Sequence, residues 1–142
     1  MKIGPLLAHL HELETGLAAE LRAAADRRRA EHDVYHQCQT FALAADKRVQ
    51  RLEPLAGRYD RRSEWTTAVG DGSDDLLQEL RTLYLRAQEV AMTWTMALQA
   101  AKALRDRDLL KLATECQAEP EAQGKWFTTR IKVAAPQAIV LG

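Results

Sequence analysis

Apolar residues recur every three or four positions over four stretches of the chain, a spacing typical of amphipathic helices. In the first stretch the series is Leu6, Leu10, Leu13, Leu17 and Leu21. Similar series predict three more helices, so that the four expected helices cover about residues 5–28, 34–56, 74–105 and 108–134. The sequence therefore predicts an all-α protein.

The boundary between the first two helices follows from length, because no Gly or Pro marks it. A single helix from residue 5 to residue 56 would be about 78 Å long, which is too long for a compact domain of this size. We therefore expect a turn near residues 28–33, with Asp33 as the N-cap of the second helix. Pro5 suits the first turn of the first helix.

The stretch 57–73 contains the turn-forming series Gly70-Asp71-Gly72-Ser73 and is expected to be a loop. Fully extended, it could reach about 55 Å, which is enough to cross the length of a helical bundle. Ser73 or Asp74 is expected to cap the third helix.

The fourth helix is expected to start at Asp106 or Asp108 and to be kinked or split at Pro120. Proline lacks the backbone N–H and its ring clashes with the preceding turn. The short apolar tail 136–142 is expected to follow the helix, either docked on the bundle or disordered.

Composition narrows the class of protein. The 142 residues suit one domain (1–142), and 46% hydrophobic residues suffice for its core. Twenty basic and twenty acidic residues cancel, so no strong field attracts nucleic acid or a membrane surface. The one basic run, Arg27–Arg29, is flanked by acidic residues and is expected to be solvated.

The hydrophobic pattern and the low cysteine content together predict a cytoplasmic location. No apolar run approaches the roughly 20 residues that a membrane span needs, and the first residues lack the apolar core of a signal peptide. Cys38 and Cys116 fall on core stripes and are expected to be buried free thiols.

The segment Thr40–Glu53 (TFALAADKRVQRLE) resembles the second helix of small bacterial members of the ferritin-like superfamily, which often carry His-Val-x-Arg-Leu there. The order and lengths of the expected helices over about residues 5–135 also resemble those of this superfamily. The resemblance implies an antiparallel four-helix bundle with a long crossover between the second and third helices.

In that superfamily the first and third helices each supply a metal-bridging Glu, and the second and fourth each supply Glu-x-x-His. Glu14 falls in the first slot and is expected to point inward. The second helix has Ala45 and Arg48 in place of its motif, and the fourth has Glu119 followed by Ala122. The only Glu within the central span of the third helix, Glu89, is expected to face solvent. The resemblance therefore implies the fold without its di-iron centre and without another cofactor.

An inward Arg48 needs partners, because an isolated buried charge is very costly. Glu14 and Glu119 are the candidates, with Gln123 as a further acceptor. We expect these four residues to form a polar cluster where the metal would otherwise lie. In the alternative, Arg48 lies at the edge of the stripe and extends its charged head into solvent.

A non-standard metal site is the second possibility, with Glu14, Glu119, His32 and His36 as ligands. If the second helix begins at Val34, however, His32 lies outside it and His36 points away from the core stripe. Both histidines are therefore expected on the surface.

The third helix carries a second apolar strip, Leu85, Met92 and Met96, largely outside its core stripe. Such a strip is typical of an interface. It predicts either a homodimer contact or a surface covered by the loop 57–73.

Together these patterns favour a non-catalytic helical bundle that acts through binding or assembly, as a homodimer and with no cofactor. One alternative is a metal-dependent (di-iron or di-manganese) oxidase or iron-handling protein with the non-standard ligands. The other alternative is a small-molecule carrier, with a pocket lined by Phe41, Tyr84 and Trp94.

Overall fold

The computed structural model describes residues 3–59 and 75–139, which form four helices and no strand. The helices are α1 (Ile3–Arg27), α2 (His32–Ala56), α3 (Leu76–Leu104) and α4 (Arg107–Ile139). The predicted all-α class is confirmed.

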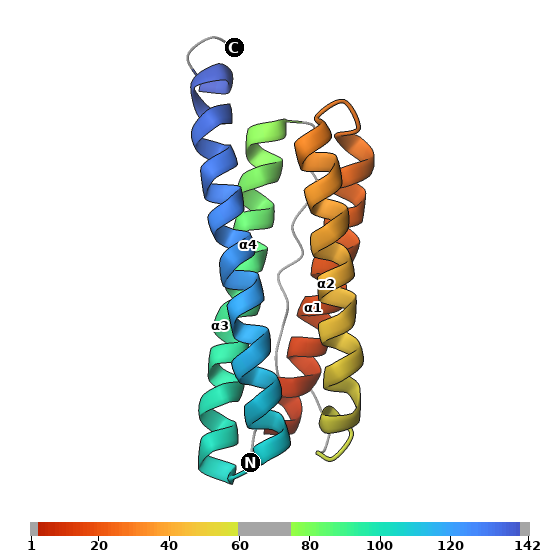
Figure 1. The fold of residues 1–142 in the computed structure, drawn as a ribbon, viewed down its shortest axis with the longest axis vertical. Coiled ribbons are helices and arrows are strands. Elements are labelled where there is room, and N and C mark those ends of the chain that lie inside the picture. The colour runs from red at the N-terminus through yellow and green to blue at the C-terminus, as the bar shows by residue number, and fades with distance from the viewer. Residues whose placement is uncertain (1–2, 60–74, 140–142) are drawn as a thin grey trace.

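The helices form an antiparallel bundle, as expected. Helices α1 and α4 run in one direction, and α2 and α3 run in the other (Figure 1). Helix α1 packs on α2 and α3, and α4 packs on the same two helices, so every neighbouring pair is antiparallel. Helix α3 begins at the opposite end of the bundle from the end of α2. Most of the loop predicted between them lies outside the described residues.

The turn between α1 and α2 falls at residues 28–31, within the expected region. The predicted N-cap at Asp33 is wrong. Glu31 occupies the N-cap position without a side-chain bond, and its carbonyl accepts the Tyr35 N–H at 2.9 Å. Helix α2 therefore begins at His32, two residues before the start of the apolar stripe at Val34.

Asp75 caps α3, since its side chain accepts the Leu77 N–H at 3.1 Å. The two residues expected in this role, Ser73 and Asp74, lie outside the described ranges. Aspartate is favoured here because its carboxylate satisfies an orphan N–H and complements the helix dipole.

The connection between α3 and α4 is a tight turn at Arg105 and Asp106. Arg105 has a left-handed φ of 55°, and the Asp106 N–H bonds to the Ala101 carbonyl at 3.1 Å, as in a helix C-terminal motif. The Asp106 carboxylate then accepts the Leu109 N–H at 3.1 Å and caps α4, as predicted.

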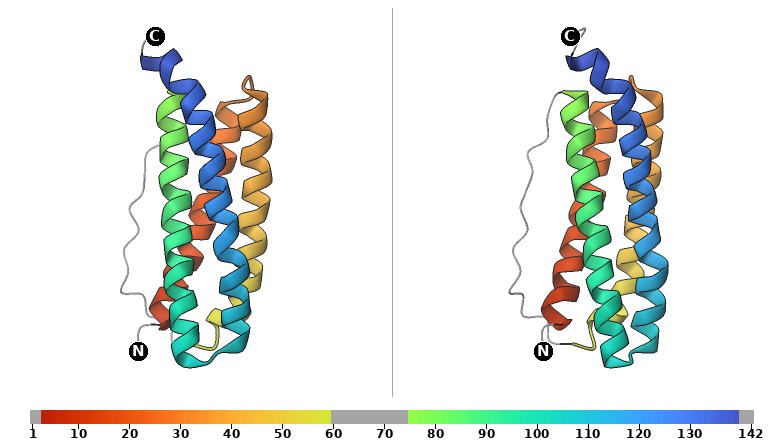
Figure 2. Two further views of the ribbon diagram at one scale, coloured as in Figure 1. Left: turned by 60° about the vertical axis from the view of Figure 1, so that its left-hand side comes forward. Right: turned by 90° about the vertical axis from the view of Figure 1, so that its left-hand side faces the viewer.

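Helix α4 runs without a break through Pro120 and Pro136. The prediction that Pro120 splits this helix is wrong, and a kink at Pro120 stays a prediction. A proline removes one backbone bond, and the remaining bonds of this long helix, with Pro120 itself buried, keep the helix intact. The predicted tail at 136–142 is also wrong as far as Ile139, because helix continues to that residue. The C-terminal turns of α4 extend past its neighbours (Figures 1 and 2).

Buried side chains from all four helices form one core, which contains most residues of the predicted stripes. Leu10, Leu52, Leu83 and Leu109 represent the four helices in it. Two charged residues, Glu14 and Arg48, are among its largest fully buried side chains. Within residues 3–59 and 75–139, none of the helices combines the length and apolar character needed to cross a membrane.

Gly16→Ala should stabilise the protein by about 0.5–1 kcal/mol, because Gly16 is exposed in the middle of α1 and alanine favours helix. A Cβ there would meet nothing within 4 Å. Urea unfolding followed by circular dichroism measures the gain. Gly124→Ala is the control: its Cβ would lie 2.8 Å from Nε2 of Gln88, so that side chain must move and the gain should be smaller. An unchanged stability of Gly16→Ala would contradict this account.

Candidate functional site

A polar cluster lies inside the bundle and receives one side chain from each helix. Its members are Glu14 of α1, Arg48 of α2, Trp94 of α3 and Glu119 of α4. Glu14, Arg48 and Trp94 are at most 1% exposed, whereas Glu119 is 48% exposed and connects the cluster to solvent. We call these four residues the central cluster.

Arg48 joins two carboxylates. Its Nε and Nη2 donate to the two oxygens of Glu14, with 2.9 Å between Nη2 and Oε1. Its Nη1 donates to Oε2 of Glu119 at 2.9 Å. This two-point contact matches the planar fork of a guanidinium to a carboxylate. The alternative in which Arg48 extends into solvent is wrong, because its side chain is 1% exposed.

Trp94 completes the cluster, and its role was missed in the sequence. Its indole Nε1 donates to Oε2 of Glu14 at 2.9 Å. The sequence placed Trp94 on the core stripe of the third helix without giving it a partner. The available signal was chemical, because a fully buried indole N–H needs an acceptor and few acceptors lie inside this core.

The charges of the cluster are mutually stabilised. Burial of the Arg48 guanidinium disfavours its charge, but hydrogen bonds and attraction from Glu14 and Glu119 outweigh burial, so the pKa of Arg48 is raised. Glu14 receives three donors, two from Arg48 and one from Trp94. Few lone pairs on Glu14 therefore remain for a cation.

Gln123 does not take part in the cluster as expected. It is buried, at 3% exposure, but its Oε1 has no hydrogen-bond partner among the described residues. Arg48 directs its donors at the charged oxygens of Glu14 and Glu119 instead, because a guanidinium bonds more strongly to an ionised carboxylate than to a neutral amide.

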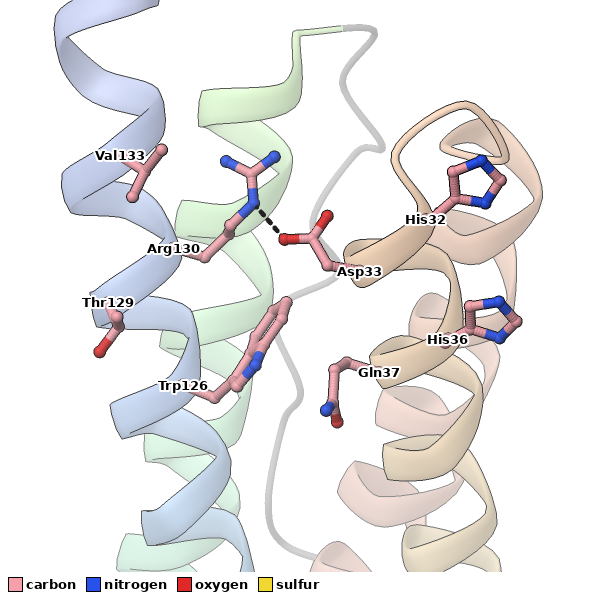
Figure 3. Close-up of a pocket in the computed structure, with 8 residues that line it drawn as sticks. All are labelled: His32, Asp33, His36, Gln37, Trp126, Thr129, Arg130 and Val133. Carbon is pink, nitrogen blue, oxygen red and sulfur yellow. Dashed lines mark hydrogen bonds and ion pairs between the residues drawn. The ribbon is translucent and has the colours of Figure 1, made fainter.

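The non-standard metal ligands are not brought together. His32 and His36 are exposed on the first turns of α2, near Asp33 and Gln37 (Figure 3). Arg48 follows His36 by twelve residues, which is about 18 Å along a helix. In the described part of the chain, no three His, Cys, Asp or Glu side chains are grouped so that they could hold a metal ion. The set of Glu14, Glu119, His32 and His36 is therefore wrong as a ligand set.

A second buried carboxylate, Glu79, was also missed. It is 3% exposed and accepts from Nε of Arg27 and from Nε of Arg28, each at 2.9 Å. It thereby ties the end of α1 to the start of α3. The expectation that the whole basic run is solvated is wrong for Arg28, which is 16% exposed. Local sequence gives no signal for partners some fifty residues apart.

Both cysteines are free and buried, as expected. Burial raises the pKa of Cys38 and of Cys116 to about 12, which makes both thiols poor nucleophiles near neutral pH. Phe41, one of the residues proposed to line a carrier pocket, packs edge-to-face on Trp126 and Phe127. It is therefore part of the packed interior, as is Trp94.

The second apolar strip of α3 is exposed. Leu85 is 47% exposed, Met92 is 63% exposed and Met96 is 40% exposed. Between them Glu89 pairs with Arg86 one turn away, at 3.4 Å. The loop proposed as an alternative cover for this strip falls largely outside the described residues.

Comparison of the chain with protein-family models, with curated proteins and with solved structures gave no match. The fold and the central cluster therefore have to be interpreted from their own chemistry.

Proposed function

We propose that this chain is a ferritin-like four-helix bundle without a di-iron centre, which acts by binding or assembly and not by catalysis. The observation that carries the proposal is the buried Arg48, bonded to Glu14 and Glu119. Its guanidinium cannot lose its proton in a protein. A fixed positive charge in contact with both carboxylates opposes a metal cation at the same place.

The chemistry of the donor set supports the same proposal. A dinuclear iron or manganese site needs several carboxylates and usually imidazoles. The central cluster offers two carboxylates, both already bonded to Arg48, and no histidine. The residues present therefore do not fit such a centre, and no catalytic step is assigned to it.

Metal analysis tests this part of the proposal. The protein is purified without a histidine tag, incubated with Fe²⁺ or Mn²⁺ and desalted. Elemental mass spectrometry should then find far less than one metal ion per chain. Arg48→Met serves as the comparison, because it removes the competing charge while keeping Glu14 and Glu119. Stoichiometric iron or manganese in the unmodified protein would instead favour the metal-dependent oxidase or iron-handling alternative.

We further propose that the assembly is a homodimer formed through the α3 strip. Leu85, Met92 and Met96 project from one side of α3, and three exposed large apolar residues on one side of a helix are typical of an interface. A two-fold axis across α3 would bury the strip of each copy against the other. A cytoplasmic location belongs to the same proposal, supported by the two free thiols.

Met92→Lys should weaken the dimer by at least about tenfold, because it would place a charge in a desolvated contact. Light scattering coupled to size-exclusion chromatography, over a dilution series, measures the mass. Leu43→Lys is the matched control. Leu43 is 58% exposed on α2, outside the strip, so the Leu43→Lys variant should form a dimer of the same affinity as the unmodified protein. Unmodified protein that stays monomeric at all concentrations would exclude the dimer.

A further inference from the structure

A groove of about 400 Å³ lies between the first turns of α2 and the C-terminal half of α4. Asp33 and Gln37 reach into it from α2, and Trp126 and Arg130 reach into it from α4 (Figure 3). Its volume is within the range of sites that hold small molecules. The central cluster and the α3 strip do not contribute to it.

The aromatic wall of the groove is held in place by its neighbours. The half-buried Trp126 packs edge-to-face on Phe41, with 5.9 Å between ring centroids, and on Phe127, with 5.4 Å. An indole fixed in this way loses little conformational entropy when a ligand stacks on it. Its face also attracts cations through the ring quadrupole.

The charges beside this wall are unbalanced. Arg130 donates through Nε to Oδ2 of Asp33 at 2.7 Å and through Nη2 to Oε2 of Glu31 at 3.3 Å. Two carboxylates therefore share one guanidinium. Oδ1 of Asp33 has no partner among the described residues, and Asp33 is 53% exposed. His32 and His36 also line the groove, but two carboxylates against one guanidinium leave a net negative formal charge next to the indole face, which is complementary to an organic cation.

We propose that this groove binds a small arylalkyl amine, whose ammonium group is held by Asp33 and whose ring stacks on Trp126. The inference rests on the proposed function only in that the bundle acts by binding. It can fail separately from the dimer, because a ligand titration does not depend on the mass of the assembly.

The probe is phenethylamine, titrated into the full chain and followed by tryptophan fluorescence and calorimetry. We expect a Kd on the order of 1 mM or lower. The matched anion, 3-phenylpropionate, should bind at least about tenfold more weakly, since it presents the same ring with the opposite charge. Equal or tighter binding of the anion, or no saturation by the amine up to about 20 mM, would overturn the proposal.

Two variants assign the contacts. Asp33→Asn should weaken phenethylamine binding at least about fivefold, whereas Asp46→Asn, which alters another aspartate of α2 bound to Arg22 of α1, should leave it unchanged. Trp126→Leu should abolish the fluorescence change and most of the heat. Circular dichroism checks that each variant is folded. If Asp33→Asn binds as tightly as Asp46→Asn, the assignment of the groove is wrong.

Discussion

Arg48→Met should destabilise the protein by about 3–5 kcal/mol, because it leaves the carboxylate of Glu14 buried without its cation. Glu14 is fully buried and would retain only the Trp94 indole as a donor. Methionine keeps much of the volume of the arginine stem, so the loss reports the charge more than a cavity. The free energy of unfolding in urea, measured at pH 7, is the test.

Two variants show whether the loss comes from the buried charge. Arg51→Met removes an arginine one turn further along α2, whose partner Glu115 and own side chain are both 45% exposed, and should change stability only slightly. Replacing both members of the buried pair, Glu14→Met with Arg48→Met, should recover part of the loss, since no unpaired charge remains. A loss for Arg48→Met no larger than that for Arg51→Met would contradict a buried ion pair.

Trp94→Ala should cost about 3–5 kcal/mol, because Trp94 is fully buried and its removal opens a large cavity in the core. Trp94→Phe should cost less, about 1–2 kcal/mol, since it keeps an aromatic ring and loses chiefly the bond from Nε1 to Glu14. The same unfolding measurement gives both values.

A double-mutant cycle separates the hydrogen bond of Trp94 from its packing. In the background of Glu14→Met and Arg48→Met the acceptor is absent, so Trp94→Phe should cost less than in the unmodified chain. Trp126→Phe serves as a control, because Trp126 is only half-buried and has no bond to the central cluster. Equal costs of Trp94→Phe in the two backgrounds would mean that the indole N–H does not stabilise Glu14.

The helix ends show the limit of sequence reasoning within one helix. The apolar stripe located α2 correctly but placed its start at Val34, whereas the helix begins at His32. A stripe marks the buried face, and the first turn of a helix can lie outside the core. The expectation that Pro120 could split α4 was wrong for a related reason: the local cost of the proline is real, but the long helix around it and its burial compensate for that cost.

The sequence alone determined the four amphipathic helices and placed Glu14 and Arg48 on core-facing stripes, because both follow from periodicity along a single helix. It left open whether the charged head of Arg48 points inward, which the structure decides. The tertiary structure decided which groups meet. The rotation and shift of the helices against each other decide these contacts. They bring Arg48 to Glu14 and Glu119, place the Trp94 indole against Glu14, leave Gln123 outside the cluster and bury Glu79 beside two arginines. Those contacts join residues more than thirty positions apart in the chain, where periodicity carries no information about register.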